Sequence, residues 1–203
     1  MIFANTLQTA DHDLDDWNST RVSIYTGRGL LVEGSNVWLY GNGVEHHALY
    51  QYQFSGAKDI FAGYIQTETP YWQPSPDAIS QPYPLNSAIS DPVYSTFCPA
   101  GQICDALGLR ILNSQNIHLY GVGLYSFFKN YDLTCSSDSA PGGKRDCQNR
   151  IASIEGSSSG ITAYSFNQVG ALQMLTVDGQ DKASWQDNLS VYSNTIGLLT
   201  YKV

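Results

Sequence analysis

The chain has 203 residues, of which 42% are hydrophobic, and this is enough for one domain with a substantial core. Its formal net charge of −8 and its ten scattered Lys and Arg residues argue against a nucleic-acid surface, which needs clustered basic side chains. No apolar run is long enough to span a bilayer, and the first four residues are too short for a secretory signal, so we expect a soluble chain with no nucleic-acid or membrane partner and with any signal outside it.

Residues 1–20 are polar and contain a dense run of potential metal ligands. Four Asp and one His fall within residues 11–16. Such a group could hold calcium or a transition metal. A solvated turn before the first strand explains the run more simply, so we expect no metal site here.

A four-residue phrase recurs along the chain and predicts its fold. It stands at residues 36–39 (NVWL), 59–62 (DIFA), 116–119 (NIHL) and 160–163 (GITA). Asn, Asp and Gly tolerate positive φ, so each phrase begins with a bend, and the alternating apolar residues that follow predict a short strand. The first interval is 23 residues, and the 44 residues from Ile117 to Ile161 equal two steps of 22. This period predicts an all-β solenoid, a parallel β-helix whose coils stack about 4.8 Å apart.

Two acidic residues occupy the same phase of this repeat. Glu45 follows Val37 by eight residues, and Glu68 follows Ile60 by eight, so the two side chains should lie one above the other on adjacent coils. Hydrolysis of a glycosidic bond needs a proton donor for the leaving oxygen and assistance for the attacking water. Two close carboxylates resist ionising together, so the pKa of one rises and it stays protonated. Outward-facing glutamates at a repeat position are the simpler alternative.

Three residues beside this pair are candidates for substrate binding. Gln66 precedes Glu68 by two positions and should share its face. His46 and His47 follow Glu45, and at most one of them should point the same way, because neighbours on a strand face opposite sides. A contact to a sugar hydroxyl and a structural role both remain open. The chain shows neither a nucleophilic Ser/His/Asp set nor a dinucleotide-binding fingerprint, so we expect no cofactor.

A proline-rich stretch follows the first coils. Six prolines fall within 23 residues, from Pro70 to Pro92, and this composition cannot continue a sheet. We therefore expect a long excursion over residues 70–105. Tyr71 and Trp72 at its start offer flat rings on which a pyranose could stack, although packing within the loop explains them equally well.

The four cysteines form two local pairs, Cys98 with Cys104 and Cys135 with Cys147, and each pair brackets turn-forming residues. Zinc would require different spacing or accompanying histidines. We predict two short-loop disulfides and an oxidising compartment. The second lies in a loop over residues 132–149, and a less regular segment over residues 171–203 should cap the solenoid, so that residues 1–203 form a single domain.

Several unusual phrases carry a family resemblance. ADHDLDD, RGLLVEG, WLYGNGVEHHALYQY, IQTETPYWQP, GLRI and GLYSFF, in this order, resemble the C-terminal part of fungal glycoside hydrolase family 55. The resemblance runs from Ala10 to near the end of the chain and includes both cysteine pairs. It implies a right-handed, pectate-lyase-like parallel β-helix, an inverting exo-β-1,3-glucanase (laminarinase) activity, a β-1,3-glucan or related ligand, and secretion. Family members have two tandem β-helical halves with the cleft between them, and this chain resembles one half.

The resemblance also assigns roles to the two glutamates. QTETPY resembles the segment that bears the general acid, which points to Glu68. VEHH resembles the segment whose glutamate belongs to the network around the attacking water, which points to Glu45, although the two roles could be exchanged. An inverting enzyme needs carboxyl groups about 6.5–9.5 Å apart. Side chains on adjacent coils reach this separation only by splaying.

Without the other half, three functions stay open. The chain is the acid-bearing half of a β-1,3-glucan hydrolase, or a lectin-like β-glucan-binding module with little or no turnover, or a purely structural solenoid. The uncovered end coil and cleft face predict self-association, as a symmetric dimer.

Overall fold

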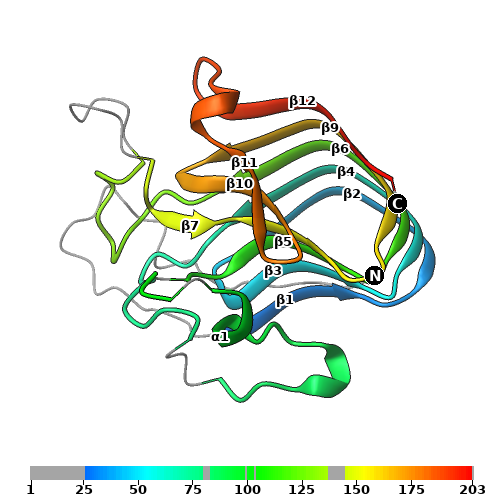
Figure 1. Ribbon diagram of the computed structural model, residues 1–203, viewed down its shortest axis with the longest axis horizontal. Helices are drawn as coiled ribbons and strands as arrows, with labels where there is room; N and C mark the ends of the chain where they lie inside the picture. The colour runs from blue at the N-terminus through cyan, green and yellow to red at the C-terminus, as the bar shows by residue number, and fades with distance from the viewer. Residues whose placement is uncertain (1–25, 80–82, 99, 103, 137–144, 203) are drawn as a thin grey trace.

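The structure is a computed structural model that describes residues 26–79, 83–98, 100–102, 104–136 and 145–202. Within these residues the chain is nearly all β, with twelve strands in two sheets (Figure 1). The acidic run at residues 11–16 lies outside the described residues, and so does the expected N-terminal turn. No helix in the described ranges is long and apolar enough to cross a membrane.

The chain passes back and forth between the two sheets, and each passage adds a strand beside the previous one. The first sheet contains β1 (Thr26–Val32), β3 (His47–Ser55), β5 (Leu107–Leu112), β8 (Ala152–Glu155) and β10 (Ala171–Val177), all parallel, with β7 (Gln148–Arg150) also parallel to β10 and β11 (Gln180–Ser184) antiparallel to it. The second contains β2 (Ser35–Glu45), β4 (Lys58–Glu68), β6 (Gln115–Tyr125) and β9 (Ser159–Val169), all parallel, with β12 (Asn194–Tyr201) antiparallel to β9. The all-β class and the parallel sheets predicted from the sequence are confirmed.

The recurring phrase sets the start of the four parallel strands in the second sheet. The residue that opens each phrase has positive φ: 59° at Asn36, 56° at Asp59, 55° at Asn116 and 64° at Gly160. The next residues pair in register, Val37 with Ile60, Ile60 with Ile117, and Ile117 with Ile161. The predicted bends and the apolar positions after them are therefore confirmed.

The interpretation of the longest interval was wrong. Ile117 pairs directly with Ile161, so the 44 residues between them form one coil and not two. The additional residues fall in the segment of the sequence between β6 and β7. Likewise, the chain between Ile60 and Ile117 makes one coil, and its excess lies between β4 and β5. In-register parallel pairing fixes which strands are neighbours but not the length of the connections between them, because a longer connection adds little closure entropy.

The inward side chains form one continuous core between the sheets. In the middle coils they are at most 2% exposed, and burial of each large side chain contributes roughly 1.5–3 kcal/mol. Register places chemically similar residues in columns. Two such columns are Ile60, Ile117 and Ile161, and Ala62, Leu119 and Ala163.

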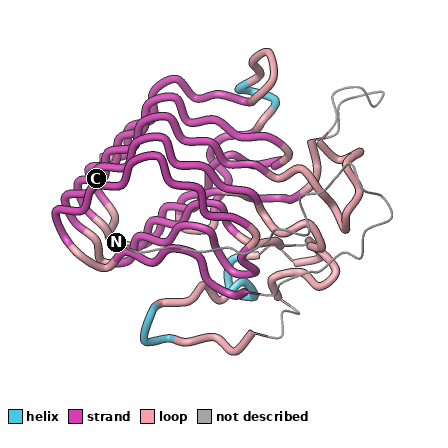
Figure 2. Tube along the Cα trace, turned by 180° about the vertical axis from the view of Figure 1, so that it is seen from behind, coloured by secondary structure: helices cyan, strands magenta, loops and turns pink. Residues whose placement is uncertain are grey.

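A second column of bends divides the long strands of the second sheet. Positive φ recurs in register at 64° for Gly41, 54° for Tyr64, 66° for Gly121 and 53° for Ser165. The strands bend together there, as Figure 2 shows from behind. The bend also shifts the alternation by one residue, so Gln66 and Glu68 point outward while the side chains between and before them are buried.

The excursion between β4 and β5 contains η1 (Ser87–Ile89) and α1 (Tyr94–Phe97), and a third short helix, η2 (Gln186–Asn188), precedes β12. Buried polar contacts attach the excursion to the first sheet. Arg110 of β5 makes a two-bond ion pair with Glu155, at 2.9 and 2.7 Å. The same guanidinium donates to the Gln53 side chain and to the Ser90 carbonyl. Because Arg110 is only 6% exposed, these bonds link the excursion to three strands of the first sheet.

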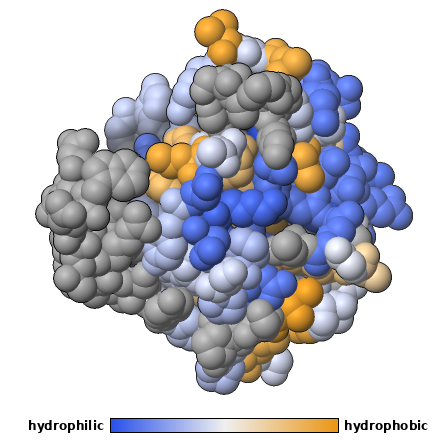
Figure 3. Space-filling view, turned by 90° about the vertical axis from the view of Figure 1, so that its left-hand side faces the viewer, coloured by the Kyte–Doolittle hydropathy of each residue, from blue (hydrophilic) through white to orange (hydrophobic). Residues whose placement is uncertain are grey.

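Both predicted disulfides are present. Cys98 bonds to Cys104 within the excursion, and Cys135 bonds to Cys147 across the second loop. The described part of the excursion between β4 and β5 extends along the bottom of Figure 1, where α1 lies, whereas the described part of the loop between β6 and β7 lies on the left-hand side. Figure 3 views that side, where hydrophilic residues run across the middle and hydrophobic residues form separate patches.

Candidate active site

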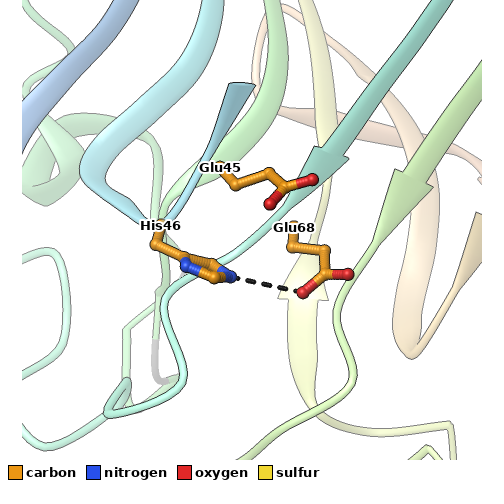
Figure 4. Close-up of side chains that lie close together, drawn as sticks. All are labelled: Glu45, His46 and Glu68. Carbon is orange, nitrogen blue, oxygen red and sulfur yellow. Dashed lines mark hydrogen bonds and ion pairs between the residues drawn. The ribbon is translucent and has the colours of Figure 1, made fainter. Parts of the chain in front are cut away.

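Glu45 and Glu68 stand side by side at the ends of β2 and β4. They are Cα partners in the parallel register, as the repeat phase predicted. Both side chains are half-buried, and one oxygen of each carboxylate and a nitrogen of His46 lie within 4.8 Å of one another (Figure 4). The pair has therefore not splayed to the separation of about 6.5–9.5 Å that an inverting hydrolase needs between its two carboxyl groups.

His46 is the histidine that joins the pair. It has φ of 63° and lies between β2 and β3, so the alternation expected for a strand does not apply to it. Its backbone N–H donates to the Glu68 carbonyl at 2.8 Å, and its fully buried ring places Nε2 3.2 Å from Glu68 Oε2. The tight turn thus aims an imidazole at the neighbouring coil.

His47 belongs to the structure beside the site and not to the site itself. Its Nδ1 lies 2.9 Å from the hydroxyl of Thr26, and its backbone N–H donates to the Gln51 side chain. Burial lowers the pKa of His47 to about 4, with a smaller contribution from His46. The ring is therefore neutral at ordinary pH and does not supply a charge.

Tyr71 and Trp72 do not form the expected stacking surface. They are 3% and 1% exposed, so neither ring offers a face to a sugar. The Tyr71 ring packs against His46 and Phe128, at centroid distances of 4.2 and 3.9 Å. Its hydroxyl donates to Glu68 Oε2 at 2.7 Å. Tyr71 therefore enters the site through its hydroxyl, while its ring and Trp72 fill the loop.

Gln66 lies where the sequence placed it. Its exposed side chain shares the outer face with Glu68, and its Nε2 donates to Glu45 Oε1 at 3.4 Å. A groove of about 230 Å³ adjoins it, and Tyr125 and Asn167 lie along the other side of this groove. Gln66 thus connects the half-buried carboxyl pair to this groove on the outer face of the second sheet.

Tyr125 is a site residue that the sequence reasoning missed. It is the register partner of Glu68 on the next strand, and its ring stacks on Phe127 at 5.3 Å. Burial raises its pKa, with smaller contributions from Tyr192 and Glu68. The signal was available, because Tyr125 follows Ile117 by the same eight residues that separate each glutamate from its own phrase.

The geometry supports proton transfer and, secondarily, metal coordination. Two carboxyl groups, an imidazole and a phenol converge on a surface that a substrate can reach. Carboxylate oxygens and an imidazole also form a donor set that a divalent transition metal accepts. Among the residues that the structure describes, no other three His, Cys, Asp or Glu side chains approach one another this closely.

Comparisons with known proteins bear on this site. No family model matches the chain. The chain is 60% identical over 197 residues to a glucan 1,3-β-glucosidase of Cochliobolus carbonum, and 38% identical over 193 residues to a probable glucan endo-1,3-β-glucosidase of Arthroderma benhamiae. These alignments include 97% and 95% of this chain but only 24% and 21% of the relatives. The chain therefore spans about a quarter of the length of the relatives it matches.

A solved structure shares the fold. sacteLam55A from Streptomyces sp. SirexAA-E superposes with a TM-score of 0.50 at 14% sequence identity, over 86% of this chain and 26% of that one. At this identity the likeness concerns the arrangement of the strands alone.

Proposed function

We propose that the chain belongs to glycoside hydrolase family 55 and is the part of a β-1,3-glucan hydrolase that carries the general acid. Its 60% identity to a glucan 1,3-β-glucosidase supports this proposal. The observation that supports this most strongly is the pair Glu45 and Glu68, which stand in register and close together beside Gln66, a residue that lines a groove. The chain spans about a quarter of the length of these relatives. We therefore propose the hydrolytic activity for the whole protein and the general acid for this chain.

Glu68 is the general acid in this proposal. Tyr71 donates to Oε2 of Glu68 and His46 lies against the same oxygen, so two neighbours fix the orientation of the carboxyl group. Glu45 stands beside it, and adjacent carboxyl groups resist ionising together, which favours retention of a proton by one of them. When Glu68 gives this proton to the leaving oxygen, the Tyr71 hydroxyl stabilises the carboxylate that forms.

Glu45 supports the acid and is not the base opposite it. In an inverting hydrolase the sugar and the attacking water lie between acid and base, at carboxyl separations of about 6.5–9.5 Å. Oxygens of Glu45 and Glu68 within 4.8 Å leave no room for both. We assign Glu45 to the hydrogen-bond network that includes Gln66, and we place the group that activates the water in the remainder of the longer protein.

We further propose that the fold is a right-handed parallel β-helix forming one domain over residues 1–203, with the excursion at 70–105 and the disulfide loop at 132–149. The in-register parallel pairing of alternate strands supports this architecture. The two disulfides support an oxidising compartment and hence secretion.

An assay of laminarin hydrolysis, measured as the release of reducing sugar, tests the proposed function. We expect glucose release by the protein that contains this chain, and loss of that release in Glu68→Gln. Release that survives Glu68→Gln contradicts the assignment of the acid. The alternative is a lectin-like module, which predicts calorimetric binding of β-1,3-oligosaccharides without any product.

We also propose that the isolated chain associates with itself as a symmetric dimer. In the described part of the chain, β1 and β2 each pair on one side only, which leaves backbone groups along this end of both sheets for another copy. Light scattering measures the outcome, and a mass near 22.3 kDa that does not change with concentration contradicts it.

A further inference from the structure

The outer face of the second sheet carries six aromatic residues that the proposed reaction does not use. We name them the aromatic platform: Trp38 and Tyr40 on β2, Phe61 and Tyr64 on β4, Tyr120 on β6, and Tyr164 on β9. Trp38 is 80% exposed, Tyr64 is 64% exposed, and Tyr120 and Tyr164 are 40% and 42% exposed. Tyr64, Tyr120 and Tyr164 lie on strands that pair on both sides, so their exposure does not come from a sheet edge. Large contiguous patches of exposed apolar surface are uncommon in soluble proteins and mark interaction or ligand-binding sites.

The rings of the platform touch one another in order across the four strands. Centroid distances are 5.2 Å from Trp38 to Phe61, 5.4 Å from Phe61 to Tyr120, and 4.8 Å from Tyr120 to Tyr164, the last two pairs being stacked. Tyr40 meets Tyr64 edge to face at 5.5 Å. Neighbours therefore hold each ring in place, and a ligand that binds here pays little to order them.

The platform continues into the groove beside the carboxyl pair. Tyr64 borders the groove, and Gln66 borders it one outward position further along β4. Outward positions two residues apart are separated by roughly 7 Å, so Tyr64, Gln66 and Glu68 form a path about 13 Å long. Gln66 contacts Glu45 at the end of this path. One continuous surface thus links the exposed rings to the candidate acid.

The chemistry of this surface suits an uncharged sugar chain. Every side chain that lines the groove is uncharged, and the polar ones among them offer amides and phenols. Aromatic faces and edges that alternate with a few amide groups are typical of sites for polar ligands with apolar faces, as pyranose rings have. A polyanion would find no cation in this lining, and a purely apolar ligand would leave the amides unpaired.

We propose that the aromatic platform and its groove bind a β-glucan chain along the outer face of the second sheet. The choice of β-glucan as the ligand rests on the proposed function, because the path from the platform ends at the candidate general acid. Binding by the platform does not itself depend on turnover. Because the platform lies at a distance from the candidate acid, only a long chain reaches both, and the platform adds affinity for long chains over short ones.

Pull-down with insoluble linear β-1,3-glucan tests the proposal, with Glu68→Gln as the parent protein so that hydrolysis plays no part. The platform variant is Trp38→Ala, Tyr120→Ala and Tyr164→Ala in that parent, which leaves the positive-φ positions unchanged. The matched control is Ile79→Ala, Leu85→Ala and Leu133→Ala, three exposed apolar residues away from the platform. We expect at least tenfold weaker binding for the platform variant, and binding within twofold of the parent for the control. Circular dichroism establishes that both variants are folded.

Three outcomes overturn the proposal. They are equal binding by the platform variant and its parent, no binding by the parent, and a platform variant that changes only the oligomeric mass, which identifies a protein interface. A laminarin hydrolysis assay on the wild type distinguishes failure of this binding proposal from failure of the proposed function. If the wild type does not hydrolyse laminarin but its binding still depends on the platform, only the proposed function is contradicted. In an active protein the platform variant should raise KM for long glucans at least fivefold and leave KM for laminaribiose unchanged.

Discussion

Removal of the Tyr71 hydroxyl should slow glucan hydrolysis without weakening substrate binding. In Tyr71→Phe the ring keeps its contacts with His46 and Phe128, and only the 2.7 Å bond to Glu68 Oε2 is lost. A hydrogen bond to a charged group contributes about 1.5–3 kcal/mol. Because Glu68 becomes a carboxylate only as it gives up its proton, this bond strengthens in the transition state. The loss therefore corresponds to a kcat lower by about 10- to 150-fold, with KM nearly unchanged.

Initial rates on laminarin at several concentrations, in the chain or in the full-length protein that contains it, measure this effect. Tyr94→Phe is the matched control, because its hydroxyl donates to the Leu49 carbonyl at 2.5 Å, is equally buried and does not touch the carboxyl pair. The control should lose stability and keep its kcat. If Tyr71→Phe retains kcat within twofold, or changes KM alone, the Tyr71 hydroxyl does not act through the acid.

Three further predictions concern stability, measured by urea unfolding. Gly170→Ala should destabilise by more than about 3 kcal/mol, because φ is 87° and a Cβ would lie 1.8 Å from the Ser126 carbonyl oxygen, whereas Gly197→Ala, with nothing within 4 Å, should change stability by less than about 0.5 kcal/mol. Arg110→Met should cost about 3–5 kcal/mol, since it strands a partly buried glutamate, and a loss below about 1 kcal/mol contradicts the anchoring role. Burial, with a smaller contribution from a neighbouring aspartate, raises the pKa of Asp105 to about 8, so the folded state binds its proton more tightly than the unfolded state. The unfolding free energy should therefore fall as pH rises from about 4 to 8, and Asp105→Asn should flatten that dependence, whereas an unchanged slope contradicts it.

The sequence determined the strands of the second sheet and the pairing of the two glutamates. Residues such as Asn36 and Asp59 take positive φ readily, and the apolar alternation after them permits only one face inward. Each coil stacks on the previous one in register, so equal phase in the sequence becomes adjacency in space. For this reason Glu45 and Glu68 could be paired, and Tyr125 could have been added, from spacing alone.

Only the tertiary structure decided the surroundings of the pair. The orientation of His46 depends on a turn that interrupts the strand alternation, and the burial of Tyr71 depends on Phe128, which belongs to a loop more than fifty residues away. The 44-residue coil was misread because an inserted loop adds residues without adding a strand. Local spacing encodes which backbone groups pair. The positions of loop side chains follow instead from packing between segments distant in sequence, and no repeat phase records such contacts.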